Sequence, residues 1–410
     1  MSRLVLAALA LVTCGPRPPV EQDEPMSTTT GATGSSSAEP EPTTSPAPLD
    51  CDSVCDVPWT HDGDLEITPA TDPAALRCLR RVTGDLTIRD FSGPLPAELL
   101  ALRDVDGLFA LQHNDGLVDL AGLECLRRVD GLIFEGNDAL IDLAALTDLE
   151  SSRMLFAQTN GALADLSPLS GLAGLELLDL NVNPALQRLP TLPHGTRLDS
   201  LVLWGSPLLT DLDPLAGLEG TPGQILLEDL PALTSLAGLS GMFAADDPPG
   251  ELVLGRLPAL ASLSGLESLQ EASALDLHEL PQITSLAPLA GLRRVERFDI
   301  GTLPALASLV GLDGLEFVDS LGIGGCSGAS GSPLLLDLTG LGSLGELHHL
   351  ALRANVGLQS LAGLTALAVG PDTLVVTGSP NLPAEQFDAF VAAHGVPDVC
   401  QDPQDACACP

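Results

Sequence analysis

The sequence contains no lysine, so all 17 of its basic residues are arginines, and they face 55 acidic residues. A chain without lysine cannot form the phosphate-binding loop that depends on a lysine side chain. The formal net charge of -38 repels nucleic-acid phosphates and anionic lipid surfaces, which excludes both as expected partners. The charge suits a solvated acidic surface, a cationic partner or divalent ions, and composition alone leaves these three open.

Motifs of catalysis are missing too. The chain has no His-Glu-x-x-His zinc motif and no Gly-x-Ser-x-Gly nucleophile elbow. Its seven histidines are scattered, with one adjacent pair at His348 and His349. We therefore expect a protein that is not an enzyme and that uses no cofactor or catalytic metal.

The N-terminal apolar run, Leu4 to Val12, is too short to span a bilayer. It follows Arg3 and leads into Leu11-Val12-Thr13-Cys14, which resembles the lipobox of a bacterial lipoprotein signal. The resemblance implies that residues 1–14 are a signal segment and that a lipid on Cys14 is the only attachment to the membrane. The expected location is the outer membrane or cell surface of a bacterium, with secretion as the alternative.

Residues 15–50 contain Pro, Ser, Thr, Glu and Gly and almost no large apolar side chain. Such a segment cannot bury enough surface to offset the entropy of ordering, so we predict a disordered tether. A tether between a lipid and a folded body would hold that body away from the membrane. This favours a role in display at the cell surface.

From Leu117 onward the phrase Leu-x-x-Leu-x-x-Leu recurs, and most copies begin 23 residues after the previous one. The copies begin at Leu117, Leu140, Leu163, Leu186, Leu209, Leu233, Leu260, Ile283, Leu306, Leu335 and Leu358. Longer intervals mark insertions at 242–250 and 324–333, the second of which contains Cys326. Such a period indicates stacked coils. One coil buries too little apolar surface to offset the ordering of its own backbone, so neighbouring coils must share a core.

The residues around this phrase resemble a known family. Leu126 to Val129, Gly131-Leu132, Asn137 and Leu140 resemble the receptor L-domain branch of the leucine-rich-repeat superfamily. The resemblance implies an α/β fold, a right-handed solenoid with one parallel β-sheet face and short helical or 3-10 turns opposite, used for recognition. We assign residues 83–383 to about twelve such coils, preceded by a cysteine-containing cap and first coil at 51–82.

Two ladders of polar residues accompany the repeats. Three residues before the first leucine stand Asn114, Asn137, Asn160, Asn183 and Asn355, which the resembled family uses to hold the turn after the strand. The middle coils carry Leu-Pro there, where proline presets the turn and leucine fills the space. The second ladder comprises Asp119, Asp142, Asp165, Asp211, Ser235, Ser262, Ser285, Ser308, Asp337 and Ser360 and is interrupted by Arg188. We interpret it as a row of caps on short helical turns. A calcium-binding row is the alternative, and it would suit a structural envelope protein.

The C-terminal segment 384–410 is predicted to be a cap helix followed by a cysteine-rich tail. The helix should run from Ala384 to His394, place Phe387, Phe390 and Val391 on one face, and end at Gly395. We expect it to cover the open edge of the last coil, because an uncovered edge invites strand addition.

The cysteines of an exported chain are expected to form disulfides. The candidates are Cys51, Cys55, Cys78, Cys400, Cys407 and Cys409. Cys78 should pair with Cys51 or Cys55. Cys125 lies 47 residues after Cys78 at an equivalent position two coils away, too far for a disulfide between the two, so we expect a buried thiol there.

The residues between the strand leucines should point outward, because side chains alternate along a strand. The predicted ligand-binding surface is Phe156, Asp179, Val202, Trp204, Leu226, Glu228, Asp276, His278, Arg297, Asp299, His349 and Arg353. Tryptophan and arginine are enriched at binding hot spots, and aromatic residues are scarce in this chain. We therefore expect this face to bind a protein or a glycan, with an ordinary exposed strand surface as the alternative and the oligomeric state left open.

Overall fold

The structure is a computed structural model that describes residues 50–243, 250–325, 331–402 and 404. These residues belong to one compact unit, Leu49–Pro410. The predicted signal segment with Cys14, nearly all of the predicted tether, the middle of both insertions with Cys326, and Cys407 and Cys409 lie outside the described residues.

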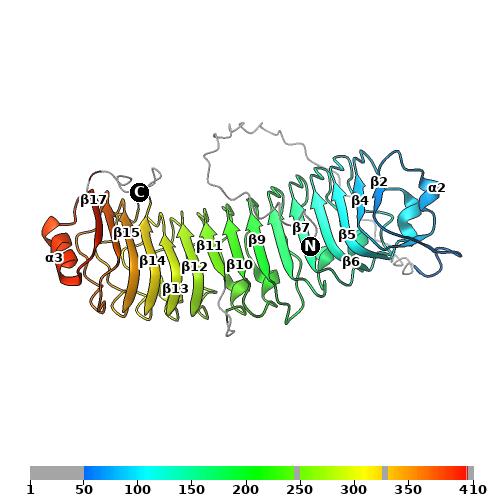
Figure 1. The fold of residues 1–410 in the computed structure, drawn as a ribbon. Coiled ribbons are helices and arrows are strands. Elements are labelled where there is room, and N and C mark those ends of the chain that lie inside the picture. The colour runs from blue at the N-terminus through cyan, green and yellow to red at the C-terminus, as the bar shows by residue number, and fades with distance from the viewer. Residues whose placement is uncertain (1–49, 244–249, 326–330, 403, 405–410) are drawn as a thin grey trace, which may run out of the picture. The chain divides into compact units, whose positions relative to one another are not determined.

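The described chain forms a 17-stranded sheet with few helices (Figure 1). The first strands are β1 (Trp59–His61), β2 (Leu65–Ile67), β3 (Leu79–Val82), β4 (Leu86–Arg89), β5 (Asp104–Gln112) and β6 (Arg128–Glu135). The middle strands are β7 (Met154–Gln158), β8 (Leu177–Asn181), β9 (Ser200–Trp204), β10 (Gln224–Glu228), β11 (Glu251–Gly255) and β12 (Glu271–His278). The last are β13 (Arg294–Ile300), β14 (Phe317–Gly324), β15 (Glu346–Arg353), β16 (Thr373–Thr377) and β17 (Asp398–Asp402).

All strand pairs in the sheet are parallel. From β5 to β17 each strand pairs with the next one in the chain. At the N-terminal end β1 pairs with β3 and β2 with β4, and both rows meet on the longer β5. This continuous parallel order is that of a repeat solenoid.

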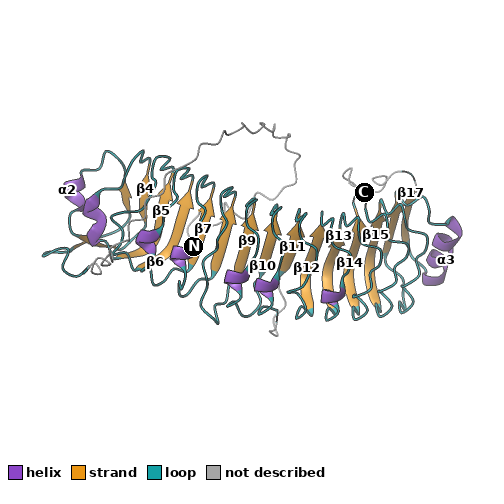
Figure 2. Ribbon diagram, turned by 180° about the vertical axis from the view of Figure 1, so that it is seen from behind, coloured by secondary structure: helices purple, strands orange, loops and turns teal. Residues whose placement is uncertain are grey.

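Short helices lie in the connections between strands (Figure 2). They are α2 (Pro73–Leu76), α3 (Ala384–His394) and the 3-10 helices η1 (Ala97–Ala101), η2 (Ala144–Leu146), η3 (Ser167–Leu169), η4 (Asp213–Leu215), η5 (Ala237–Leu239) and η6 (Ala287–Leu289). Asp72 caps the start of α2 by accepting the Ala74 N–H. The helix predicted at 384–394 is confirmed, and Gly395 ends α3 in a left-handed conformation with φ of 65°.

The repeated leucines form the core. In the clearest copy Leu186, Leu189 and Leu192 are at most 3% exposed, and Leu178 and Leu180 of β8 are fully buried. The core residues of the coils form one continuous cluster from Ile67 to Val396. Burial of each coil therefore depends on the coils on either side, as expected for stacked units.

The buried asparagine ladder holds the turns of the early coils. Asn114 accepts a hydrogen bond from the Phe91 backbone and donates from Nδ2 to the Ile88 carbonyl at 3.0 Å and to Asn137 Oδ1 at 3.0 Å. The same bonds repeat from Asn137 to Asn160 and from Asn160 to Asn183. Each side chain thus links three successive coils. In the middle coils the replacing leucines are fully buried, at Leu230, Leu257, Leu280 and Leu303.

The side chains of the Asp and Ser ladder accept free backbone N–H groups at the start of the turns, as predicted, and in five coils that turn is a 3-10 helix. Asp142 Oδ1 accepts the backbone N–H of Ala144 at 2.7 Å, at the first residue of η2, and Ser285 Oγ accepts that of Ala287 in η6. All other members of the ladder make the same bond to the residue two positions on. Arg188, which interrupts the ladder, forms an ion pair with Asp165 of the preceding coil at 2.7 Å.

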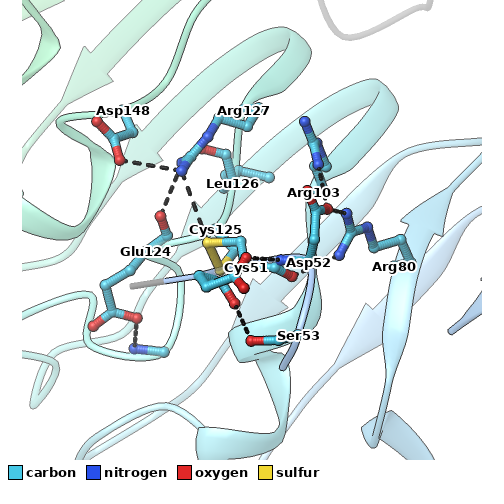
Figure 3. The surroundings of a disulfide bond; sticks show 12 residues. Cys51, Asp52, Ser53, Arg80, Arg103, Glu124, Cys125, Leu126, Arg127 and Asp148 are labelled. Atoms are coloured by element: carbon cyan, nitrogen blue, oxygen red, sulfur yellow. Dashed lines mark hydrogen bonds and ion pairs between the residues drawn. A yellow bond between two sulfur atoms is a disulfide. The ribbon is translucent and has the colours of Figure 1, made fainter. Parts of the chain in front are cut away.

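Two disulfides hold the N-terminal end. Cys55 pairs with Cys78, as predicted, but Cys51 pairs with Cys125, so the expectation of a buried thiol at Cys125 is wrong. Cys51 lies before the first coil, so the stacking distance that separates Cys78 from Cys125 does not restrict it. Figure 3 shows this disulfide beside Asp52, which pairs with Arg80 and Arg103. Cys400 is disulfide-bonded as well.

The C-terminal end differs from the prediction in one respect. The helix α3 buries Phe387 and Phe390 of its predicted apolar face. The edge of β16, however, is covered by an additional strand, β17, which was predicted only as part of a cysteine-rich tail. Its sequence, Asp398–Asp402, holds only two apolar side chains, Val399 and Cys400, too few to give a strand pattern.

Replacement of Asn137 by alanine should lower the free energy of unfolding by about 2–4 kcal/mol, because it leaves the Leu111 carbonyl and the Asn114 N–H buried without their partner. Chemical denaturation followed by circular dichroism measures this loss. Gln187→Ala, at an exposed position two coils further on, is the control and should change stability by less than about 0.5 kcal/mol.

Removal of the Cys51–Cys125 disulfide should destabilise the protein more than removal of Cys55–Cys78. The first closes a loop of 74 residues and the second one of 23, so chain entropy predicts losses of about 4.4 and about 3.4 kcal/mol. Paired serine variants compared in one denaturation series test this order, and a larger loss for the Cys55–Cys78 pair would contradict it.

Candidate functional site

The predicted outward residues lie on one side of the sheet, which we call the sheet face, defined as the outward positions of β6 to β15. In β8 the leucines Leu178 and Leu180 are buried, whereas Leu177, Asp179 and Asn181 are partly exposed. The same alternation holds in β7 and β10. The prediction of which strand residues face outward is therefore confirmed for these coils.

The strand register places apolar side chains of the sheet face in one line, which we call the apolar row. It consists of Ile133, Phe156, Val202, Leu226 and Val253. All except Val202, which is 9% exposed, are partly exposed. Ile133 and Val253 were not among the predicted residues, although the alternation in their strands would have identified them.

One charged residue interrupts the apolar row. Asp179 lies directly opposite Phe156 on one side and Val202 on the other. Burial among these neighbours raises the pKa of its carboxyl from 3.8 to about 6. Among the described residues its hydrogen-bond partner is the Asn181 Nδ2 group at 2.5 Å, which donates to Asp179 Oδ1. No arginine or histidine of the described chain forms an ion pair with it.

Trp204 lies on β9, directly opposite Asn181 and diagonally opposite Asp179. Trp204 is partly exposed, but its indole N–H is buried and has no hydrogen-bond partner in the described part of the chain. The indole is thus packed down on the sheet face with part of its ring accessible. Phe156 and Trp204, predicted from their scarcity as possible contact residues, stand on the two strands that flank Asp179.

A network of charges occupies the sheet face beyond the apolar row. The His278 ring lies between Asp276, at 3.0 Å from Nδ1, and Glu228, at 3.3 Å from Nε2, two strands away. This reach is possible because Gly255 stands between them, and a Cβ there would come within 2.2 Å of the His278 ring. Hydrogen bonds to Asp276 and Glu228 raise the pKa of His278 to about 10. Arg256 also pairs with Glu228 at 2.9 Å.

Asp299 and Arg297 form the next part of this network. Asp299 lies directly opposite Asp276, and its pKa is raised first by burial and then by the Asp276 carboxylate. Arg297 approaches Asp299 at 3.6 Å and Glu251 at 3.3 Å. The predicted residues Glu228, Asp276, His278, Arg297 and Asp299 are thus brought together as paired charges.

A shallow hollow of about 680 Å³ lies at the starts of β10 to β14. Its lining includes the small residues Gly223, Gly250 and Ser273 and the acidic residues Glu296 and Asp319. None of the nine residues that line it is aromatic. The hollow is a polar extension of the sheet face.

His349 and Arg353 lie on β15, further along the sheet face. His349 is aligned with Ser320 and Arg353 with Gly324. They are separated from the apolar row by the charged network of β12 and β13. Along the line of the apolar row, the structure therefore divides the predicted surface into an apolar half on β6 to β11 and a polar half on β12 to β15. The charged network reaches back to Glu228 of β10 and Glu251 of β11.

Comparison with protein-family models and with curated proteins finds no match to the chain. Within the described ranges, no group of three or more His, Cys, Asp or Glu side chains is placed to hold a metal ion. The helices of the described chain include none that is long and apolar enough to cross a membrane. The disulfides indicate an oxidising, extracytoplasmic environment.

Replacement of Asp179 by asparagine should stabilise the protein at pH 7.5 by about 1–2 kcal/mol, since it removes a poorly solvated charge. The folded-state pKa of about 6 lies above the ordinary 3.8, so the cost of this charge is absent below pH 3.8 and complete above pH 6. The advantage of the variant should therefore vanish as the pH falls through this window.

Urea denaturation of both proteins across this pH range measures the difference. Glu219→Gln, which changes an exposed carboxylate, is the control and should show no such dependence. A stabilisation by Asp179→Asn that is equal at pH 4 and pH 7.5 would show that the carboxylate is well solvated.

Proposed function

We propose that the protein is a leucine-rich-repeat recognition protein, wound as a right-handed solenoid, that binds a partner protein on its sheet face. The observation that carries the proposal is the apolar row, a line of apolar side chains, all but Val202 partly exposed, on a surface with no covering layer among the described residues. Contiguous apolar surface of this kind is typical of interaction sites. In this proposal the chain has no catalytic role.

The chemistry of the partner follows from charge. A net charge of -38 opposes association of two copies of the chain and association with nucleic acid. A protein whose apolar contact surface is bordered by arginine or lysine complements the apolar row and the acids around it, among them Glu135 and Glu228. We therefore propose a basic protein partner.

The glycan and calcium alternatives have less support. Sugar rings commonly stack on aromatic side chains, and the polar hollow has none in its lining. The carboxylates of the Asp and Ser ladder accept backbone N–H bonds as caps, which accounts for their presence without calcium. The apolar row accounts for a protein partner more directly.

The proposed location is the bacterial cell envelope. The lipobox-like segment that ends at Cys14 supports lipid anchoring, and residues 15–50 would serve as the tether. The disulfides support an exported protein. The sheet face would then be presented to partners outside the inner membrane.

Leu226→Asp, between Val202 and Val253 in the apolar row, should weaken binding of the partner at least tenfold, because it places a charge where apolar surface is buried. The partner is first captured from cell-envelope extract with the body from residue 51 onward and identified. Its affinity is then measured by calorimetry with purified components.

The matched control is Val310→Asp, which introduces the same charge at a 52% exposed position in a turn away from the sheet face. Equal binding by the parent and the Val310 variant, with loss for Leu226→Asp, supports the proposal. Unchanged binding by both variants would place the interaction on another surface.

A further inference from the structure

The surroundings of Asp179 differ from those of every neighbouring position in the apolar row. The residue directly opposite on β7 is Phe156, and the residue diagonally opposite on β9 is Trp204. Diagonal neighbours on adjacent strands are about 7–8 Å apart, which is within reach of an aromatic side chain. A carboxylate is therefore flanked by two of the chain's few aromatic rings.

The direction of the carboxylate is also defined. The hydrogen bond from Asn181 Nδ2 to Asp179 Oδ1 draws the carboxyl group along β8 toward the level of Trp204. A cation that contacts this carboxylate would lie near the exposed part of the indole. Cations within about 6 Å of an aromatic ring gain further attraction from its π electrons.

The carboxylate has a cost for the folded protein. An apolar residue at position 179 would continue the row from Phe156 to Val202 without interruption, whereas the aspartate is a charge held away from water. Stability alone does not explain this residue, because a carboxylate in apolar surroundings lowers stability unless a cation accompanies it.

We propose that Asp179, Phe156 and Trp204 form a binding site for one organic cation, the guanidinium or ammonium group of a single basic side chain of the partner. Asp179 supplies the charge and the two aromatic rings supply the sides of the site. This inference rests on the proposed function and deepens it, because it names the residues that would distinguish a partner with a suitably placed basic side chain from one without it.

Asp299 shows by contrast why Asp179 is the site. The strand register aligns Asp179 and Asp299 in the same line of outward residues across the sheet face. Asp299 already has Arg297 at 3.6 Å, and its register neighbours are Asp276 and Gly322. The chain itself therefore supplies the cation at Asp299, whereas at Asp179 the partner supplies it.

The test uses the fluorescence of Trp204 in the full chain. Trp59, the other of the two tryptophans, is changed to phenylalanine so that only Trp204 emits. The probes are butylguanidinium, butylammonium and the neutral butylurea, each added at pH 7.5. We expect a saturable change with at least one cation and none with butylurea, and the stronger of the two cations identifies arginine or lysine as the source.

Two variants make the result specific. Asp179→Asn should weaken the response to the cation at least tenfold, and Asp299→Asn, the matched control, should leave it within twofold of the parent. The response should also fall as the pH decreases below 6, because protonation of Asp179 removes the charge. A thermal melt of each variant confirms that it is folded.

A cation response that persists in Asp179→Asn, or the absence of any response to both cations, would overturn the inference. These outcomes are distinct from failure of the proposed function, which is decided by Leu226→Asp and the intact partner. If Leu226→Asp abolishes partner binding while Asp179→Asn leaves the cation response and the partner affinity unchanged, the sheet face is the binding surface and Asp179 is not its cation site.

Discussion

The structure depends on the burial of leucines between neighbouring coils. A single coil buries too few side chains to offset the entropy of ordering its own residues, so each coil is stable only with another on both sides. The asparagine ladder follows the same rule, since each buried amide bonds to backbone or side-chain groups of adjacent coils. The two ends of the stack lack one neighbour. Disulfides hold the first coils, and α3 with β17 completes the last.

The regular core leaves the sheet face free to vary. Because most inward positions must be leucine or a similar residue, chemical differences between coils lie mainly at outward positions, at glycines and in the switch from buried asparagine to buried leucine. Gly255 lets His278 reach Glu228, and Gly322 lets the Asp299 carboxylate lie across β14. These contacts neutralise much of the polar half of the face. Along the line of the apolar row, Asp179 is the one carboxylate, and it has no ion-pair partner in the described chain.

Much of the fold could be predicted from local pattern. The repeated leucine phrase predicted the core, and the alternation in β8 predicted its outward residues. The pattern of Phe387, Phe390 and Gly395 predicted helix α3 and the residue at which it ends. Prediction failed where the chain leaves the repeat. Cys51 precedes the first coil, so the repeat pattern does not indicate which residues lie beside it. Its disulfide with Cys125 could therefore not be predicted. The strand β17 has almost no apolar signal and is formed by pairing with β16.

The sequence by itself determined the stacking of coils and the buried ladders, because both follow from residues repeated at a fixed interval, and its composition determined the sign of the net charge. Only the tertiary structure decided which outward residues are neighbours. Parallel register brought His278 to Glu228 across β11, although the two are 50 residues apart and the insertion at 242–250 lies between them. The physical reason is that insertions of unequal length separate the strands, so adjacency across them is fixed by hydrogen bonding of the sheet and not by sequence distance.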